Sequence, residues 1–116
     1  MKITIPDYKL PSRNQLYSSN NWRNRKQIVD ELKSIVSVYI PHKMIDDRVD
    51  ITIKAYYKTK LLRDSDNIEA KLVIDCLKGK VIHDDNVKYV RRVTTEAIIG
   101  AEENKLEIEI HSIING

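Results

Sequence analysis

Two acidic clusters contain the residue types that could do chemistry, Asp64-Ser65-Asp66-Asn67 and His83-Asp84-Asp85-Asn86. Asp64 and Asp66 are two residues apart, so in an extended segment both side chains project to the same side. If Asp85 approaches them, three carboxylates repel one another unless a cation neutralises them. Oxygen ligands suit Mg²⁺, with Mn²⁺ possible, and such an ion activates water and stabilises charge on a phosphoryl oxygen. We therefore predict Asp64, Asp66 and Asp85 as metal ligands and catalytic residues.

Each cluster also has a simpler interpretation. An acidic pair before a helix is often only an N-cap, and Asp84-Asp85-Asn86 taken alone is more often a turn than a ligand set. Lys71 lies five residues after Asp66 on a predicted helix, where it could stabilise a pentavalent phosphate. The alternative for Lys71 is an ordinary solvated lysine. For His83, we favour a surface turn over a ligand or proton shuttle.

The charge is unevenly distributed along the chain. Residues 1–63 have a net charge of +7 and residues 64–116 a net charge of −4, for a total of +3. This asymmetry predicts a polyanion-binding face beside an acidic site. Candidate contacts to backbone phosphates are Arg13, Arg23, Arg25, Lys26, Lys60, Arg63, Lys88 and Arg92.

Two adjacent arginines and two aromatic residues are further candidates for DNA contact. Arg91 and Arg92 are neighbours, and in a flat strand they point to opposite faces, so we expect at most one of them to face DNA. Tyr17 and Trp22 could stack on an exposed base, although for Trp22 we favour packing within the protein.

The hydrophobic pattern predicts the elements that position these residues. Period-two alternation predicts strands over 2–5, 49–58, 87–99 and 105–113, the last two forming an antiparallel hairpin around a turn at 100–104. Helical spacing predicts one helix from Asn21 to about Tyr39 and a second from a cap at Asp66 or Asn67 to Gly79. Residues 6–20 have a loop composition.

This order, β-α-β-α-β-β, predicts one α/β domain of the α+β-like kind over residues 1–116. We expect a small, mixed, twisted sheet with two helices on one face. No apolar stretch is long enough to span a membrane, and no signal-peptide core is present at the N-terminus. The single cysteine, Cys76, cannot form an internal disulfide, so we expect a cytoplasmic protein with no membrane partner.

The run DSDNIEAKLVIDCLKGKVIHDDNVKYV over 64–90 resembles the core of RusA-type endodeoxyribonucleases, the Holliday-junction resolvases of bacteria and prophages. The family pattern is D-x-D-N, a helix with Lys and Asp, a short apolar stretch, D-D and a strand. The N-terminal strand, the loop with P-S-x-N and the closing strands also fit, so the resemblance covers nearly the whole chain. Its specificity depends on residues 64–90.

The resemblance implies a homodimeric, Mg²⁺-dependent nuclease that makes paired nicks in branched DNA during recombination and repair. It places the metal-binding aspartates on Asp64, Asp66 and Asp85, and the helical lysine on Lys71. That lysine lies one residue later than in the family, as does Asp75, which indicates an insertion in the first helical turn. The alternatives are a non-catalytic DNA-binding dimer and a small nuclease acting on other branched DNA or on RNA.

Overall fold

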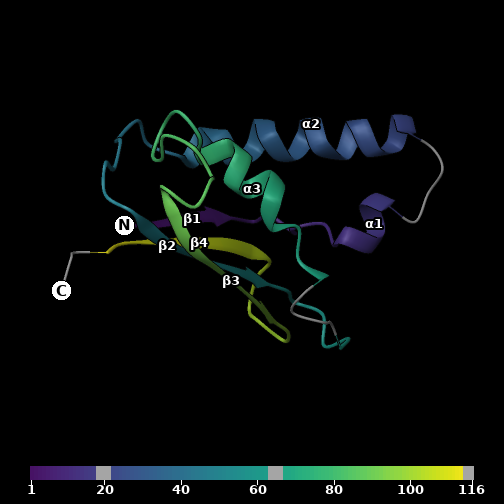
Figure 1. Cartoon of the computed structure of the whole chain (residues 1–116). Helices are drawn as coiled ribbons and strands as arrows, with labels where there is room; N and C mark the ends of the chain where they lie inside the picture. Colours follow the sequence, from purple (N-terminus) through teal and green to yellow (C-terminus); the bar gives the residue numbers. More distant parts are fainter. Residues whose placement is uncertain (18–21, 63–66, 114–116) are drawn as a thin grey trace.

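The computed structural model describes residues 1–17, 22–62 and 67–113, which form a four-stranded mixed sheet and three helices (Figure 1). The elements in chain order are β1 Lys2–Pro6, α1 Arg13–Tyr17, α2 Trp22–Tyr39, β2 Val49–Tyr56, α3 Ala70–Leu77, β3 Val90–Ile98 and β4 Lys105–Ser112. The α+β class and the predicted strands are confirmed, and α1 is an additional helix.

The strand order is β1-β4-β2-β3, and it corrects one prediction. β3 and β4 do not form a hairpin, because β3 pairs with β2 in parallel and β4 lies between β1 and β2, antiparallel to both. Ile108 is thus opposite Ile3 on one side and Ile53 on the other. β3 is an edge strand with mostly exposed side chains, whereas β4 is a central strand that is hydrogen-bonded to a neighbour on each side.

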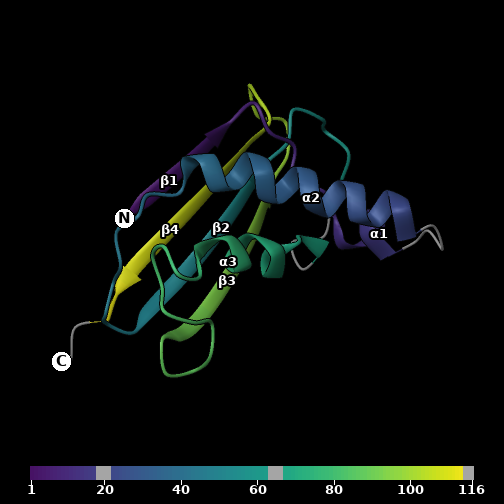
Figure 2. The same cartoon turned by 90° about the horizontal axis from the view of Figure 1, so that it is seen from above.

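Helices α2 and α3 cover one face of the sheet, as Figures 1 and 2 show from two directions. The core forms between that face and the helices, because alternate strand residues point toward them. It includes Ile51, Ile53, Leu106, Ile108 and Ile110 from the sheet and Leu32, Val36, Val73 and Leu77 from the helices. Cys76 belongs to the same core, and burial raises the pKa of its thiol.

Helix α1 lies where a loop was predicted, and a capping box accounts for it. The backbone N–H of Gln15 donates to Ser12 Oγ over 3.1 Å, and the backbone N–H of Ser12 donates to Gln15 Oε1 over 2.8 Å. Ser12 also forms a β-bridge with Ile68, and the Asn14 backbone N–H donates to Asn67 Oδ1. These contacts hold α1 beside the start of α3.

The ends of α3 differ partly from the prediction. Its N-cap is Glu69, whose carboxylate accepts a hydrogen bond from the Leu72 backbone N–H, so Asn67 is not the cap and Asp66 lies outside the described residues. After α3 the chain turns at Gly79, whose φ of +78° is the left-handed conformation expected there. In the part of the chain that the structure describes, no helix is both long and apolar enough to cross a membrane.

Candidate active site between α1, α3 and β3

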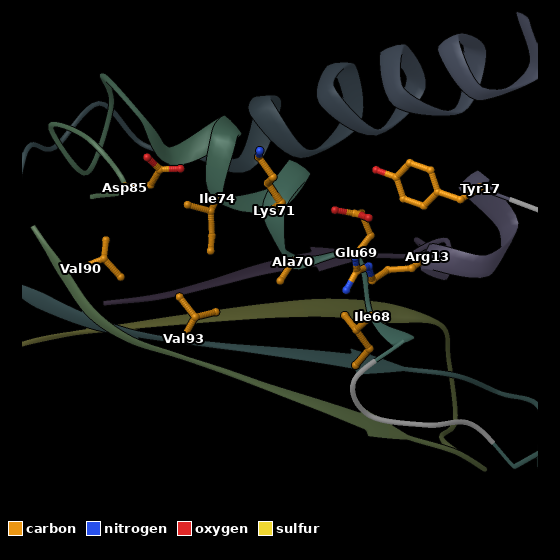
Figure 3. Close-up of a pocket in the computed structure, with 10 residues that line it drawn as sticks. All are labelled: Arg13, Tyr17, Ile68, Glu69, Ala70, Lys71, Ile74, Asp85, Val90 and Val93. Atoms are coloured by element: carbon orange, nitrogen blue, oxygen red, sulfur yellow. The ribbon is translucent and has the colours of Figure 1, made fainter. Parts of the chain in front are cut away.

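A pocket of about 390 Å³ lies between α1, the start of α3 and the edge strand β3 (Figure 3). Its walls combine apolar side chains with four charged ones and a tyrosine: Arg13, Tyr17, Ile68, Glu69, Ala70, Lys71, Ile74, Asp85, Val90 and Val93. Asp85 lies at one end and Arg13 and Tyr17 at the other, with Glu69 and Lys71 between them. Two of the predicted catalytic residues, Asp85 and Lys71, therefore line one cavity.

Asp85 is held in place by the loop that follows α3. The backbone N–H of Asp85 donates to the side chain of Asp84 over 2.8 Å, so the predicted turn and the predicted ligand occur together. Its carboxylate also forms an ion pair of 3.2 Å with Lys78, which forms a second ion pair of 3.2 Å with Asp75. The hydrogen bond from Lys78 lowers the pKa of Asp85, and the two carboxylates raise the pKa of Lys78.

Lys71 lines the pocket from the first turn of α3, and its amino group points toward α2 in Figure 3. The ammonium group that contacts Asp85 belongs to Lys78, the C-cap residue of α3. The site thus has two lysines: Lys71 lines the pocket, and Lys78 forms an ion pair with Asp85.

Glu69 is a pocket residue that the sequence did not single out. Its side chain is almost fully buried, with 3% of the residue exposed, although it lines the cavity. One carboxylate oxygen caps α3, which explains why a charged group is found at this position. Glu is uncommon at an N-cap, so the sequence carries no cap signal at this position.

Asp64, Asp66 and Arg63 lie outside the described residues, so the three-carboxylate cluster stays a prediction. The chain that follows them, from Ile68 to Lys71, lines the same pocket as Asp85. Within residues 1–17, 22–62 and 67–113, no three His, Cys, Asp or Glu side chains are grouped to hold a metal ion. Asp85 offers the pocket a carboxylate, the ligand type that Mg²⁺ prefers, so the chemistry of this residue fits such an ion.

The predicted phosphate-binding residues fall into three places. Four belong to α1 and the start of α2. These four are Arg13, Arg23, Arg25 and Lys26. Lys88 and Arg92 follow Asp85 along the chain, just before β3 and near its start. Lys60 lies in the loop after β2, where its side chain approaches Gly100.

The interpretation of Arg91 and Arg92 changes because of a bulge between β2 and β3. The pairing register shifts between Val49 and Asp50, so Arg91 is the extra residue of a bulge and the strand is not flat there. Arg91 is held by Asp50, with Nη2 at 2.6 Å and Nε at 3.0 Å from its carboxylate oxygens, while Arg92 lies opposite Asp50. The argument that only one of the two arginines can face DNA therefore does not apply.

The structure also shows the positions of Trp22 and His83. Packing was the favoured interpretation of Trp22, and it is wrong: 62% of the residue is exposed. His83 is a surface residue, as favoured, with Nε2 at 2.8 Å from an oxygen of Asp46 and its ring 5.2 Å from that of Tyr89.

Comparisons with known proteins add one match. A family model described as Endodeoxyribonuclease RusA matches residues 7–111 of the 116-residue chain. The match includes α1, α3, β3 and every residue of the pocket described above. No curated protein matches the chain.

Proposed function

Because the chain belongs to the RusA endodeoxyribonuclease family, a family of Holliday-junction resolvases, we propose that it cuts four-way DNA junctions by paired, metal-dependent nicks. The observation that supports this proposal best is the single pocket shared by Asp85, Lys71 and Arg13. A carboxylate beside cationic side chains suits the hydrolysis of a phosphodiester, which needs both a ligand for a metal ion and groups that neutralise phosphate. We also propose that the protein is cytoplasmic.

Asp85, with Asp64 and Asp66 from the preceding segment, would hold Mg²⁺ or Mn²⁺ at this pocket. When bound, the ion supplies a water of lowered pKa and offsets negative charge on the phosphate. The reaction forms a bond between the water oxygen and phosphorus and breaks one P–O bond of the backbone. Lys71, which lines the pocket, would neutralise the charge that develops on the phosphate oxygens. Lys78 would orient the Asp85 carboxylate through their 3.2 Å ion pair.

The first test is a nicking assay on a synthetic four-way junction, with Mg²⁺ and with EDTA. We predict that Asp85→Asn lowers the nicking rate at least about a hundredfold, because the amide cannot replace a charged ligand. Junction binding should be retained. Glu103→Gln removes the same charge from an exposed turn and should leave the nicking rate unchanged. Nicking by Asp85→Asn at the wild-type rate would contradict the assignment.

The paired nicks and the homodimer need a separate measurement. Symmetric cleavage of two strands requires two sites related by a twofold axis, and one chain of 13.5 kDa offers one such pocket among its described residues. On a supercoiled plasmid that extrudes a cruciform, paired nicks give a linear product, whereas independent single nicks give a nicked circle. Sedimentation at the assay concentration should show a mass of two chains. A monomer that makes only nicked circles would exclude this part of the proposal.

A further inference from the structure

Two aromatic side chains at the junction of α1 and α2 are largely exposed. Trp22 is 62% exposed and Tyr17 is 59% exposed, whereas Tyr57 and Tyr8 are buried in the core. Large aromatic rings contribute most to stability when they are removed from water, so leaving two of them exposed needs a reason. Neighbouring exposed apolar groups on a folded protein commonly mark a binding surface.

Both rings are held beside guanidinium groups. The guanidinium of Arg23 lies 5.5 Å from the centre of the Trp22 ring, and that of Arg25 lies 5.5 Å from the centre of the Tyr17 ring. Arg25 Nε also donates to the carbonyl oxygen of Leu16 over 2.9 Å, which fixes α1 against α2. The rings therefore belong to a built arrangement rather than to independent surface side chains.

The surrounding charge favours an anionic ligand. Neither α1 nor α2 has an acidic residue in its first turn, although acidic residues are the ones that stabilise a helix start. The first turns instead contain Arg13, Arg23 and Arg25, and Lys26 follows, paired with Asp30. Positive side chains at a helix start interact unfavourably with the helix dipole, and such a local cost is typical of residues that serve binding.

One of the two rings, Tyr17, belongs to the candidate active site, whereas Trp22 lines a neighbouring groove on α2 with Arg23 and Lys26 and with the carboxylates of Asp30 and Glu31. Tyr17 and Arg13 line the pocket that also contains Lys71 and Asp85 (Figure 3). Figures 1 and 2 both place α1 and the start of α2 together, at the end of the molecule toward which the first turn of α3 points. A strand whose phosphate lies at Asp85 can therefore continue along the pocket to the Tyr17 ring, and Trp22 follows at the start of α2.

We propose that Tyr17 and Trp22 form a stacking surface for unpaired nucleobases of the bound DNA. The proposal rests on the proposed function only in taking DNA as the ligand. Aromatic rings interleaved with cations are the combination that binds single strands, because every base has a face to stack and every nucleotide a phosphate to neutralise. A second copy of the chain is disfavoured as the occupant, because a twofold contact would place this basic surface against itself.

Trp22 is the one tryptophan of the chain, so its fluorescence reports on this surface directly. The experiment titrates the full-length protein in EDTA with a short labelled single strand, and with an abasic strand of the same length and phosphate number. Label anisotropy measures binding and tryptophan emission measures stacking. We expect the base-containing strand to quench Trp22 at saturation and the abasic strand to bind more weakly without quenching.

Variants separate the rings from the charges. Tyr17→Ala and Trp22→Ala should weaken binding of the base-containing strand about fivefold or more, with no change for the abasic strand. Tyr17→Phe and Trp22→Phe keep a ring and should retain the affinity. The control is Tyr39→Ala, which removes a 43% exposed tyrosine from the other end of α2 and should have no effect.

Three outcomes would overturn the stacking surface: equal quenching by the abasic strand, saturation without quenching, or Trp22 emission that depends on protein concentration alone. The last outcome would show a second copy covering the ring. The nuclease proposal is tested independently, because Asp85→Asn should abolish nicking yet keep the quenching. If the wild-type protein nicks junctions normally but its Trp22 emission is not quenched by the base-containing strand, the stacking proposal fails and the nuclease proposal stands.

Discussion

Lys78 is the residue that links helix α3 to the predicted metal ligand Asp85. Sequence reasoning assigned the helical cation to Lys71, which lines the pocket, whereas the contact to Asp85 comes from Lys78. The difference has a simple cause: Lys78 meets Asp85 only because the chain turns back after Gly79, and linear spacing does not show such a return. We therefore propose different roles for the two lysines, Lys71 toward the phosphate and Lys78 toward the Asp85 carboxylate.

We predict that Lys78→Met lowers the nicking rate about tenfold, because Asp85 loses the ion pair that orients it. The Mg²⁺ concentration for half-maximal nicking should also change, which a purely structural effect would not produce. Lys78→Arg should restore most of the activity. The comparison variant, Lys43→Met, removes an exposed lysine whose loss should leave both values unchanged. Wild-type kinetics and Mg²⁺ dependence in Lys78→Met would show that Lys78 has no positioning role.

At the scale of elements, most of the architecture followed from periodicity, but the neighbours in the sheet did not. Alternation identified β3 and β4 as strands, and the short connection over 99–104 favoured a hairpin between them. Alternation shows which face a residue occupies and not which strand lies beside it, so β4 could not be placed between β1 and β2. Helix α1 did have a sequence signal, the Ser12-x-x-Gln15 capping box, within a segment whose composition suggested a loop.

The pairing of β2 with β3 includes a charged contact whose effect depends on pH. The hydrogen bond from Arg91 lowers the pKa of Asp50 from its usual 3.8. Because this pKa is depressed in the folded state, the stabilisation is complete above about pH 4 to 5 and is lost as pH falls through the folded-state value. We predict that Asp50→Asn lowers the free energy of unfolding at pH 7 and that its deficit relative to wild type shrinks below about pH 4.

Urea unfolding followed by circular dichroism at a series of pH values measures this difference. Asp47→Asn is the matched control, because Asp47 is an exposed aspartate in the segment before β2. It should show a smaller deficit than Asp50→Asn at pH 7. A deficit of Asp50→Asn that stays constant down to pH 3 would mean that the Arg91 contact does not stabilise the fold electrostatically.

At the scale of the whole molecule, the basic residues around α1 and α2 and those near Asp85 would engage DNA mainly through its phosphates. We predict that the logarithm of junction affinity falls linearly with the logarithm of salt concentration between about 50 and 200 mM. Replacing Arg13 or Arg23 by Gln should weaken binding and reduce the slope by about one per residue, whereas Lys43→Gln should not. Anisotropy titrations in EDTA test this, and a slope unaffected by either arginine would remove α1 and α2 from the DNA-binding surface.

The central position of β4 has a consequence for biosynthesis. The outer strand β1 is hydrogen-bonded to β4, so the first strand to be synthesised has no partner strand until the last one leaves the ribosome. Until residues 105–112 emerge, β2 has β3 on one side and an open edge on the other, and the hydrophobic layer beneath α2 is incomplete. A nascent chain therefore cannot assemble a finished nuclease from its early segments, and translational arrest before β4 leaves β1 without a partner strand and one edge of β2 open to aggregation.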